Sequence, residues 1–247
     1  MGTLLRKAPT RGLLPISTTT APPRTTASDR PASLLPTART TGWLYLALGV
    51  TGMLGFLLIR PQVVGEDGTA TVSLMTTHET LARAGVVADL GIVVTQVLVA
   101  LWFFRLFRRT DAFLAGTLAV FGLFNATVVL ASAAATATAV DLAPTGVQAA
   151  GQVQALTTLS ENLWGVGAVF FGLWLLPMGL LALRVGMVRP LGWVLVAGGV
   201  GYVVSSVLGF LLPDAVVATA LLTVPATVGE FWMIGYLLHG GVFRRAG

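Results

Sequence analysis

The chain has 247 residues, of which 55% are hydrophobic and 10% charged, and it contains no cysteine. Soluble domains carry about 25% charged residues, so this composition excludes an ordinary soluble protein, and the lack of cysteine excludes disulfides and thiol chemistry. The net charge of +5 comes from basic residues that flank apolar segments, so we expect no nucleic-acid partner.

The first part of the chain, residues 1–38, is rich in Thr, Pro, Ser and Arg. A segment of this composition cannot bury enough apolar surface to offset the entropy lost on ordering. Its apolar runs are also too short for the core of a secretory signal peptide. We therefore predict a disordered cytoplasmic tail.

Six apolar segments follow the tail, each close to the length of about 20 residues that a helix needs to cross a ~30 Å hydrocarbon core. They are expected at residues 42–59, 85–107, 112–135, 162–183, 191–212 and 215–238. The sequence therefore predicts an all-α polytopic membrane protein whose six-helix transmembrane domain covers residues 39–242 and has the lipid bilayer as its partner. Two long loops, 61–84 and 138–160, join spans on one side, and residues 144–160 form either an amphipathic surface helix or a plain loop.

The basic residues are distributed unevenly between the two sides of these spans. Thirteen of the fifteen fall on the side of the N-terminus, and the other two are Arg60 and Arg83. The thirteen are Arg6, Lys7, Arg11, Arg24, Arg30, Arg39, Arg105, Arg108, Arg109, Arg184, Arg189, Arg244 and Arg245. Because basic residues stay cytoplasmic, we expect a multi-pass protein of the plasma membrane with both termini inside, including the short C-terminal segment 243–247.

A family resemblance becomes visible in the fourth and fifth segments. The run Phe-Phe-Gly-Leu-Trp-Leu-Leu-Pro-Met-Gly at 170–179 is followed by Arg-Pro-Leu-Gly at 189–192 and Gly-Gly-Val-Gly-Tyr at 198–202. Together with Gly229-Glu230 in the sixth segment, this pattern resembles a bacterial family of uncharacterised six-helix integral membrane proteins, the domain-of-unknown-function family 4386. The resemblance covers about residues 38–242 and implies the fold and the membrane location, but no activity or substrate.

Small residues form stripes along two of the segments. The fourth carries them seven residues apart and the fifth four residues apart, and these are Gly165, Gly172 and Gly179, then Gly201, Ser205 and Gly209. Small residues let helix backbones approach closely in lipid, where apolar side chains alone give little driving force. We expect them to pack helices within the chain; a homo-oligomer or another membrane protein is the alternative partner.

Polar residues within the spans are the main functional lead. Glu230 shares a face of the last segment with Thr223 and Thr227, and Asp89, Gln96 and Asn125 occur in the second and third. Ionisable groups are costly within a membrane and usually face the interior of a helix bundle. Two interpretations stay open: hydrogen bonding between helices without any ligand, which is slightly favoured, and a ligand or proton site around Glu230 with Gln96 and Asn125 as candidate partners.

Known catalytic and cofactor patterns are missing. His78 and His239 are the only histidines, and both lie at or outside the ends of spans, so a haem pair within the bundle is not expected. No nucleophile elbow, P-loop or zinc-protease motif occurs. We therefore name no catalytic residue, metal or cofactor. The leading hypothesis is transport or membrane sensing, followed by an accessory subunit and, less favoured, a lipid-modifying enzyme.

Overall fold

A computed structural model describes residue 2, residues 34–212 and residues 214–244. The described residues are almost entirely helical and contain no strand. Six helical segments are long and apolar enough to cross a membrane, namely Leu35–Val63, Glu79–Phe107, Ala112–Thr145, Val147–Val185, Arg189–Leu211 and Val216–Phe243. These observations confirm an all-α, multi-pass membrane protein. Apart from residue 2, the predicted disordered tail lies outside the described residues as far as residue 33, and so does the C-terminal end 245–247. The last part of the predicted tail, residues 35–38, is helical, so the tail prediction was wrong there.

The first span begins earlier than predicted and is not a uniform α-helix. α1 (Leu35–Gly52) starts seven residues before the expected boundary at residue 42. Ala38 and Thr41, in this additional stretch, are fully buried against the bundle. A π-helix, η1 (Met53–Ile59), follows, in which the N–H of Arg60 bonds to the carbonyl of Gly55, five residues back. The short α2 (Arg60–Val63) completes the span.

The two segments predicted as long outer loops are largely helical. The first contains α3 (Gly68–Thr77), whose first turn is capped by the Asp67 carboxylate, which accepts a hydrogen bond from the N–H of Ala70 at 2.7 Å. In the second, α5 (Ala112–Leu142) runs through two 3-10 turns (Ala143–Thr145 and Val147–Ala149) into α6 (Ala150–Val185). Of the two alternatives for residues 144–160, the plain loop was wrong; most of the segment is helical, although as the start of α6 and not as a separate surface helix.

The physical reason is a second apolar core at this end of the molecule. Val72 and Met75 of α3 pack with Val140 and Val153 of the long hairpin, and all four are nearly inaccessible to solvent. The 36 residues of α6 make a helix about 54 Å long, well beyond a ~30 Å hydrocarbon core. The end of α5, the start of α6 and the whole of α3 therefore form a folded cap on the membrane domain.

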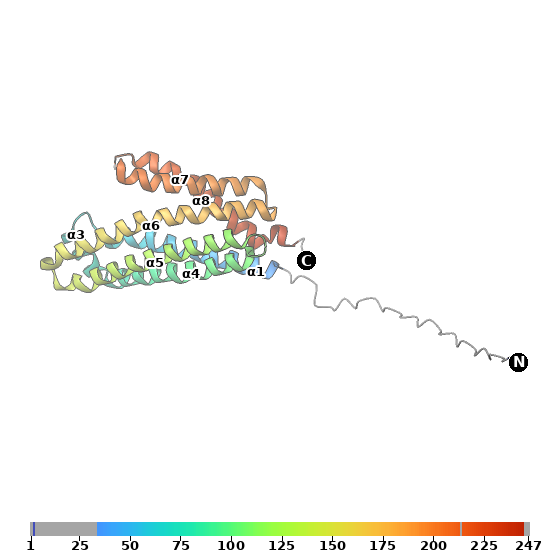
Figure 1. Cartoon of the computed structure of the whole chain (residues 1–247). Helices are drawn as coiled ribbons and strands as arrows, with labels where there is room; N and C mark the ends of the chain where they lie inside the picture. The colour runs from blue at the N-terminus through green and yellow to red at the C-terminus, as the bar shows by residue number, and fades with distance from the viewer. Residues whose placement is uncertain (1, 3–33, 213, 245–247) are drawn as a thin grey trace. The chain divides into compact units, whose positions relative to one another are not determined.

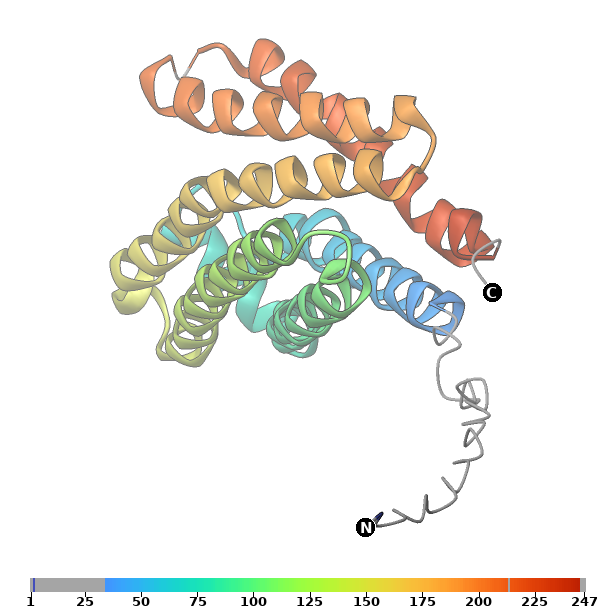
Figure 2. The same ribbon diagram turned by 45° about the vertical axis from the view of Figure 1, so that its right-hand side comes forward.

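The remaining helices are α4 (Glu79–Phe107), α7 (Arg189–Leu211) and α8 (Val216–His239), with a final turn η4 (Gly241–Arg244). Figures 1 and 2 show α6 between the α7–α8 hairpin on one side and α4 and α5 on the other. α8 packs against α7 and crosses to α1, so the chain closes on its first helix. This crossing leaves a space among α1, α6 and α8.

Large side chains are fully buried toward the end of the bundle that carries the arginines. Phe103, Phe107, Trp174, Met178 and Met233 have no exposed surface there. These side chains sit near the end of α4, the second half of α6 and the second half of α8, which all point toward the basic end. Large buried side chains therefore fill the interior of the bundle toward its basic end.

The predicted small-residue stripes lie at helix contacts to different degrees. A Cβ atom on Gly172 would lie 2.8 Å from the carbonyl oxygen of Gly199, one on Gly179 2.6 Å from that of Gly192, and one on Gly201 2.1 Å from that of Leu222. Ser205 donates a hydrogen bond to the carbonyl of Thr219 at 3.0 Å. Gly165 has only the Phe210 ring nearby, at 3.7 Å, and Gly209 faces open space.

Candidate functional site

The site is built around a contact between the first and last spans. The Tyr45 hydroxyl of α1 donates a hydrogen bond to Oε1 of Glu230 in α8. Tyr45 is 2% exposed, and its ring makes edge contacts with Phe103 and Trp174 at centroid distances of 5.5 and 5.9 Å. The aromatic packing therefore fixes the hydroxyl that faces Glu230.

Two amides share a cavity with this pair. Gln96 of α4 and Asn125 of α5 are 1% and 6% exposed, and both line a cavity of about 390 Å³ that Glu230 and Tyr45 also line. No described residue lies within hydrogen-bonding distance of either polar atom of the Gln96 side chain. A buried amide without a hydrogen-bond partner costs free energy, so Gln96 can bond to a molecule that enters the cavity.

The cavity lies at mid-depth in the membrane domain. Glu230 is nine residues before the end of α8 and Tyr45 ten residues after the start of α1, which places each about 14–15 Å from a helix end. That distance is about half of a ~30 Å hydrocarbon core. A polar group at this depth must be satisfied inside the bundle.

One wall of the cavity is incomplete. α1 and α8 meet closely near the start of α1, where a Cβ atom on Gly42 would lie 3.0 Å from the Leu238 side chain. Farther along, the cavity is bounded by Met53, Leu57 and Phe231, which are 49%, 59% and 54% exposed. The cavity therefore opens between α1 and α8 to the lipid-facing surface.

A larger pocket of about 930 Å³ adjoins this cavity on the side of the α3 cap. Phe56, Trp164 and Tyr202 line both spaces, and the rings of Phe56 and Trp164 are 5.7 Å apart. Phe56 belongs to the π-helix, a backbone form that often occurs at functional sites. Three aromatic side chains thus separate the inner cavity from the outer pocket.

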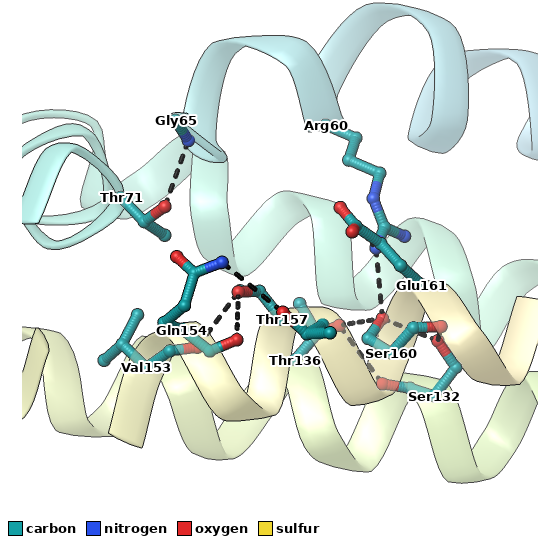
Figure 3. A network of polar contacts seen from close by, with 11 residues as sticks. Arg60, Gly65, Thr71, Ser132, Thr136, Val153, Gln154, Thr157, Ser160 and Glu161 are labelled. Carbon is teal, nitrogen blue, oxygen red and sulfur yellow. Dashed lines mark hydrogen bonds and ion pairs between the residues drawn. The ribbon is translucent and has the colours of Figure 1, made fainter. Parts of the chain in front are cut away.

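The outer pocket is bordered by a polar network that sequence reasoning missed (Figure 3). Arg60 donates to Ser160 Oγ at 3.3 Å and lies 3.8 Å from Glu161, while Ser160 Oγ is 2.7 Å from Ser132 Oγ and 3.0 Å from Thr136 Oγ1. Ser132 and Ser160 have no exposed surface. The network ties the end of the π-helix to α5 and α6 and holds Arg60 at the mouth of the pocket.

The remaining predicted site residues are distributed unequally. Thr227 lines the cavity with Glu230, but Thr223 does not, and its hydroxyl bonds to the carbonyl of Ala220 at 2.9 Å. Asp89, 9% exposed, lines a separate space of about 30 Å³ together with Arg60. That space has room for about one water molecule. The structure therefore separates Asp89 and Thr223 from the Glu230 cavity.

The direct partner of Glu230 was not among the predicted residues. A tyrosine hydroxyl in an apolar span is unusual, but Tyr45 has only Thr41 as a polar neighbour at helical spacing and no ionisable neighbour that would single it out. Among the described residues, no group of three or more His, Asp or Glu side chains could hold a metal ion. The polar groups of the cavity can therefore accept and donate hydrogen bonds, and Glu230 alone among the carboxylates can face a cation there.

These features define a multi-pass integral membrane protein with a cavity inside its bundle that a few buried polar side chains line. The chain belongs to the family described as "Domain of unknown function (DUF4386)", whose model matches residues 40–241. The match spans all six membrane helices and includes Tyr45, Gln96, Asn125 and Glu230. Comparison with curated proteins gave no significant match, and comparison with solved structures gave none either.

Proposed function

We propose that this protein binds a small molecule or ion in the cavity around Glu230 and acts in its transport, with membrane sensing as the other use of the same site. The observation that carries the proposal is Gln96, a fully buried amide with neither polar atom paired, in the cavity that Glu230 and Asn125 also line. Purely structural hydrogen bonding between helices would pair the amide within the chain. A site for a ligand leaves it free.

The asymmetric closure of the bundle favours transport over sensing. Phe103, Phe107 and Met178 have no exposed surface toward the basic end of the bundle, while Phe56 and Trp164 line both the cavity and the outer pocket. A transporter needs a site near mid-membrane that opens to one side at a time. A sensor needs the site but no path to it from the outer pocket.

The orientation that we propose places both termini in the cytoplasm and the protein in the plasma membrane. Arg105, Arg108, Arg109, Arg184 and Arg189 all lie at the end of the bundle where α1 begins and α8 ends. Basic residues accumulate on the cytoplasmic side of membrane proteins. The α3 cap and the outer pocket then face the outside of the cell.

The orientation is tested with single cysteines in this cysteine-free chain. Ser73→Cys and Gln148→Cys introduce exposed thiols at the cap, and Thr110→Cys introduces one at the opposite end. In whole cells, a membrane-impermeant maleimide should label the first two variants and leave the third unlabelled until the cells are lysed. Labelling of Thr110→Cys alone in intact cells would reverse the orientation.

Transport is tested by proton flux in proteoliposomes that enclose a fluorescent pH indicator. Compounds of three classes are added outside: amines and quaternary ammonium ions, carboxylates, and neutral amides. We expect one class to produce flux with the wild-type protein and with Glu79→Gln, which changes an exposed acid paired to Arg83. The flux should be lost in Glu230→Gln. The absence of flux from every class, with one membrane protein co-purifying stably, would overturn transport in favour of an accessory role.

A further inference from the structure

We propose that the ligand of the cavity is an organic cation with apolar substituents, such as a substituted ammonium or phosphonium ion. This inference rests on the proposed function and names the chemical class of its ligand. It follows from the charge of the lining residues, the aromatic side chains around Glu230 and the opening of the cavity to lipid.

The charge of the lining favours a cation. Among the described residues, Glu230 is the only Asp or Glu side chain that lines the cavity, and no Lys, Arg or His side chain lines it. Tyr45 donates to Oε1, and no described residue donates a hydrogen bond to Oε2. A carboxylate has two oxygens that accept hydrogen bonds, so Oε2 can face a ligand without displacing Tyr45. An anionic ligand would find no positive partner here.

Aromatic side chains share the cavity with the carboxylate. Six of them line the cavity: Tyr45, Phe56, Trp164, Phe171, Tyr202 and Phe231. Two pairs hold each other in place, with ring centroids 5.7 Å apart for Phe56 and Trp164 and 5.1 Å apart for Phe171 and Tyr202. Ring faces attract cations, and cages of aromatic side chains recognise quaternary ammonium groups. A carboxylate among aromatic rings therefore fits a cation that also carries apolar groups.

The size and access of the cavity agree with such a molecule. Its volume of about 390 Å³ falls in the range of pockets for small organic ligands, roughly 300–1,000 Å³. The opening between α1 and α8 is bordered by the half-exposed Met53, Leu57 and Phe231. A cation with apolar substituents partitions into the membrane and can enter there, whereas a small hydrated ion cannot cross that apolar border readily.

Two other ligand classes fit less well. A divalent metal ion needs several carboxylate or imidazole ligands, and the described residues contain no group of three. An anion would be attracted to Arg60, but that side chain lies in the outer pocket and is already near Glu161, at 3.8 Å. Among the described residues, the inner cavity thus combines a carboxylate with no basic side chain, whereas the outer pocket is lined by Arg60 as well as by Glu66 and Glu161.

The test compares ions of one shape and opposite charge. Tritiated tetraphenylphosphonium is equilibrated with the purified, detergent-solubilised protein, and unlabelled tetraphenylphosphonium, tetraphenylborate and neutral triphenylphosphine oxide serve as competitors. We expect saturable binding that only the unlabelled cation displaces efficiently. Glu230→Gln, in which the amide oxygen still accepts from Tyr45, should weaken binding by about tenfold or more. Glu79→Gln should leave it unchanged.

The aromatic contribution is measured in the same assay. Phe171→Leu should weaken binding roughly 2- to 30-fold, the range that loss of one cation–π contact gives. Phe113→Leu, at a position 80% exposed and outside the cavity, is the matched control and should have no effect.

The outcomes separate this inference from the proposed function. Displacement by tetraphenylborate or the phosphine oxide as strong as that by the cation, or equal binding by Glu230→Gln, would overturn the cation inference. Glu230-dependent flux driven by carboxylates or neutral amides would do the same and would leave transport standing. Saturable, Glu230-dependent cation binding without flux from any class would support the cation site and refute transport.

Discussion

Replacement of Gln96 by leucine should stabilise the protein. Both polar atoms of the Gln96 side chain are buried and without a partner among the described residues, and the residue is 1% exposed. Burial of an unpaired amide costs about 1–3 kcal/mol in proteins, and leucine has a similar volume, so little new strain or empty space is created. Gln96→Leu should therefore raise the free energy of unfolding by about 1–3 kcal/mol.

Thermal unfolding of the detergent-solubilised protein, followed by tryptophan fluorescence, measures this effect. For a chain of this size, the unfolding temperature should rise by about 2–4 °C for each kcal/mol. Gln62→Leu is the control, because Gln62 is exposed and its amide already donates to the Leu58 carbonyl at 2.5 Å. Its stability should change by no more than about 0.5 kcal/mol. A loss of more than about 1 kcal/mol in Gln96→Leu would show that the amide is already paired, and the main support for a ligand site would fail.

Three further predictions concern packing, the outer network and the Tyr45–Glu230 pair. In thermal unfolding, Gly201→Ala should destabilise the protein by about 1–3 kcal/mol, because its new Cβ would lie 2.1 Å from the Leu222 carbonyl oxygen. Gly209→Ala, in open space on the same helix, should stabilise the protein by up to about 1 kcal/mol. Equal effects of the two substitutions would contradict the helix packing. Ser160→Ala should cost about 1–3 kcal/mol in urea or thermal unfolding, because it removes the hydroxyl shared by Arg60, Ser132 and Thr136, while the exposed Thr138→Ala should be nearly neutral. Glu230→Leu should lower the unfolding free energy by about 1–3 kcal/mol by leaving the Tyr45 hydroxyl unpaired, and Glu230→Gln should not; equal losses in both would refute this reading of the pair.

The six spans could be predicted because long apolar runs are a local property of the sequence. Their ends were less predictable. Residues 150–161 contain Gln, Thr and Glu, a composition that fits a surface helix or a plain loop. Val153 is nevertheless fully buried against α3. That contact is tertiary, so the local sequence could not predict it. The π-helix at Met53–Ile59 was not predictable either, because an apolar run predicts the hydrogen-bond register of an α-helix.

The candidate site was predictable in part. Glu230, Gln96 and Asn125 were grouped because polar groups at mid-membrane must face inward, and the structure brings all three to one cavity, while their role stays a prediction. Tyr45 and the aromatic walls could not be chosen from sequence, since aromatic residues are frequent in membrane helices and only the fold selects those that face Glu230. Asp89 was grouped with Glu230 by residue type, and helix geometry puts it nearer the cap instead.

The most direct test of the central claim is whether the cavity around Glu230 admits a small molecule. Thr227→Cys places a thiol in the cavity, and Val228→Cys places one on the neighbouring position of α8, which is 52% exposed and does not line the cavity. In membranes, a small uncharged maleimide, which can enter through the lipid-facing opening, should modify Thr227→Cys much faster than Val228→Cys, because the thiolate that reacts forms beside the polar groups of the cavity and not in lipid. Equal, slow modification of both variants would contradict an accessible polar site inside the bundle.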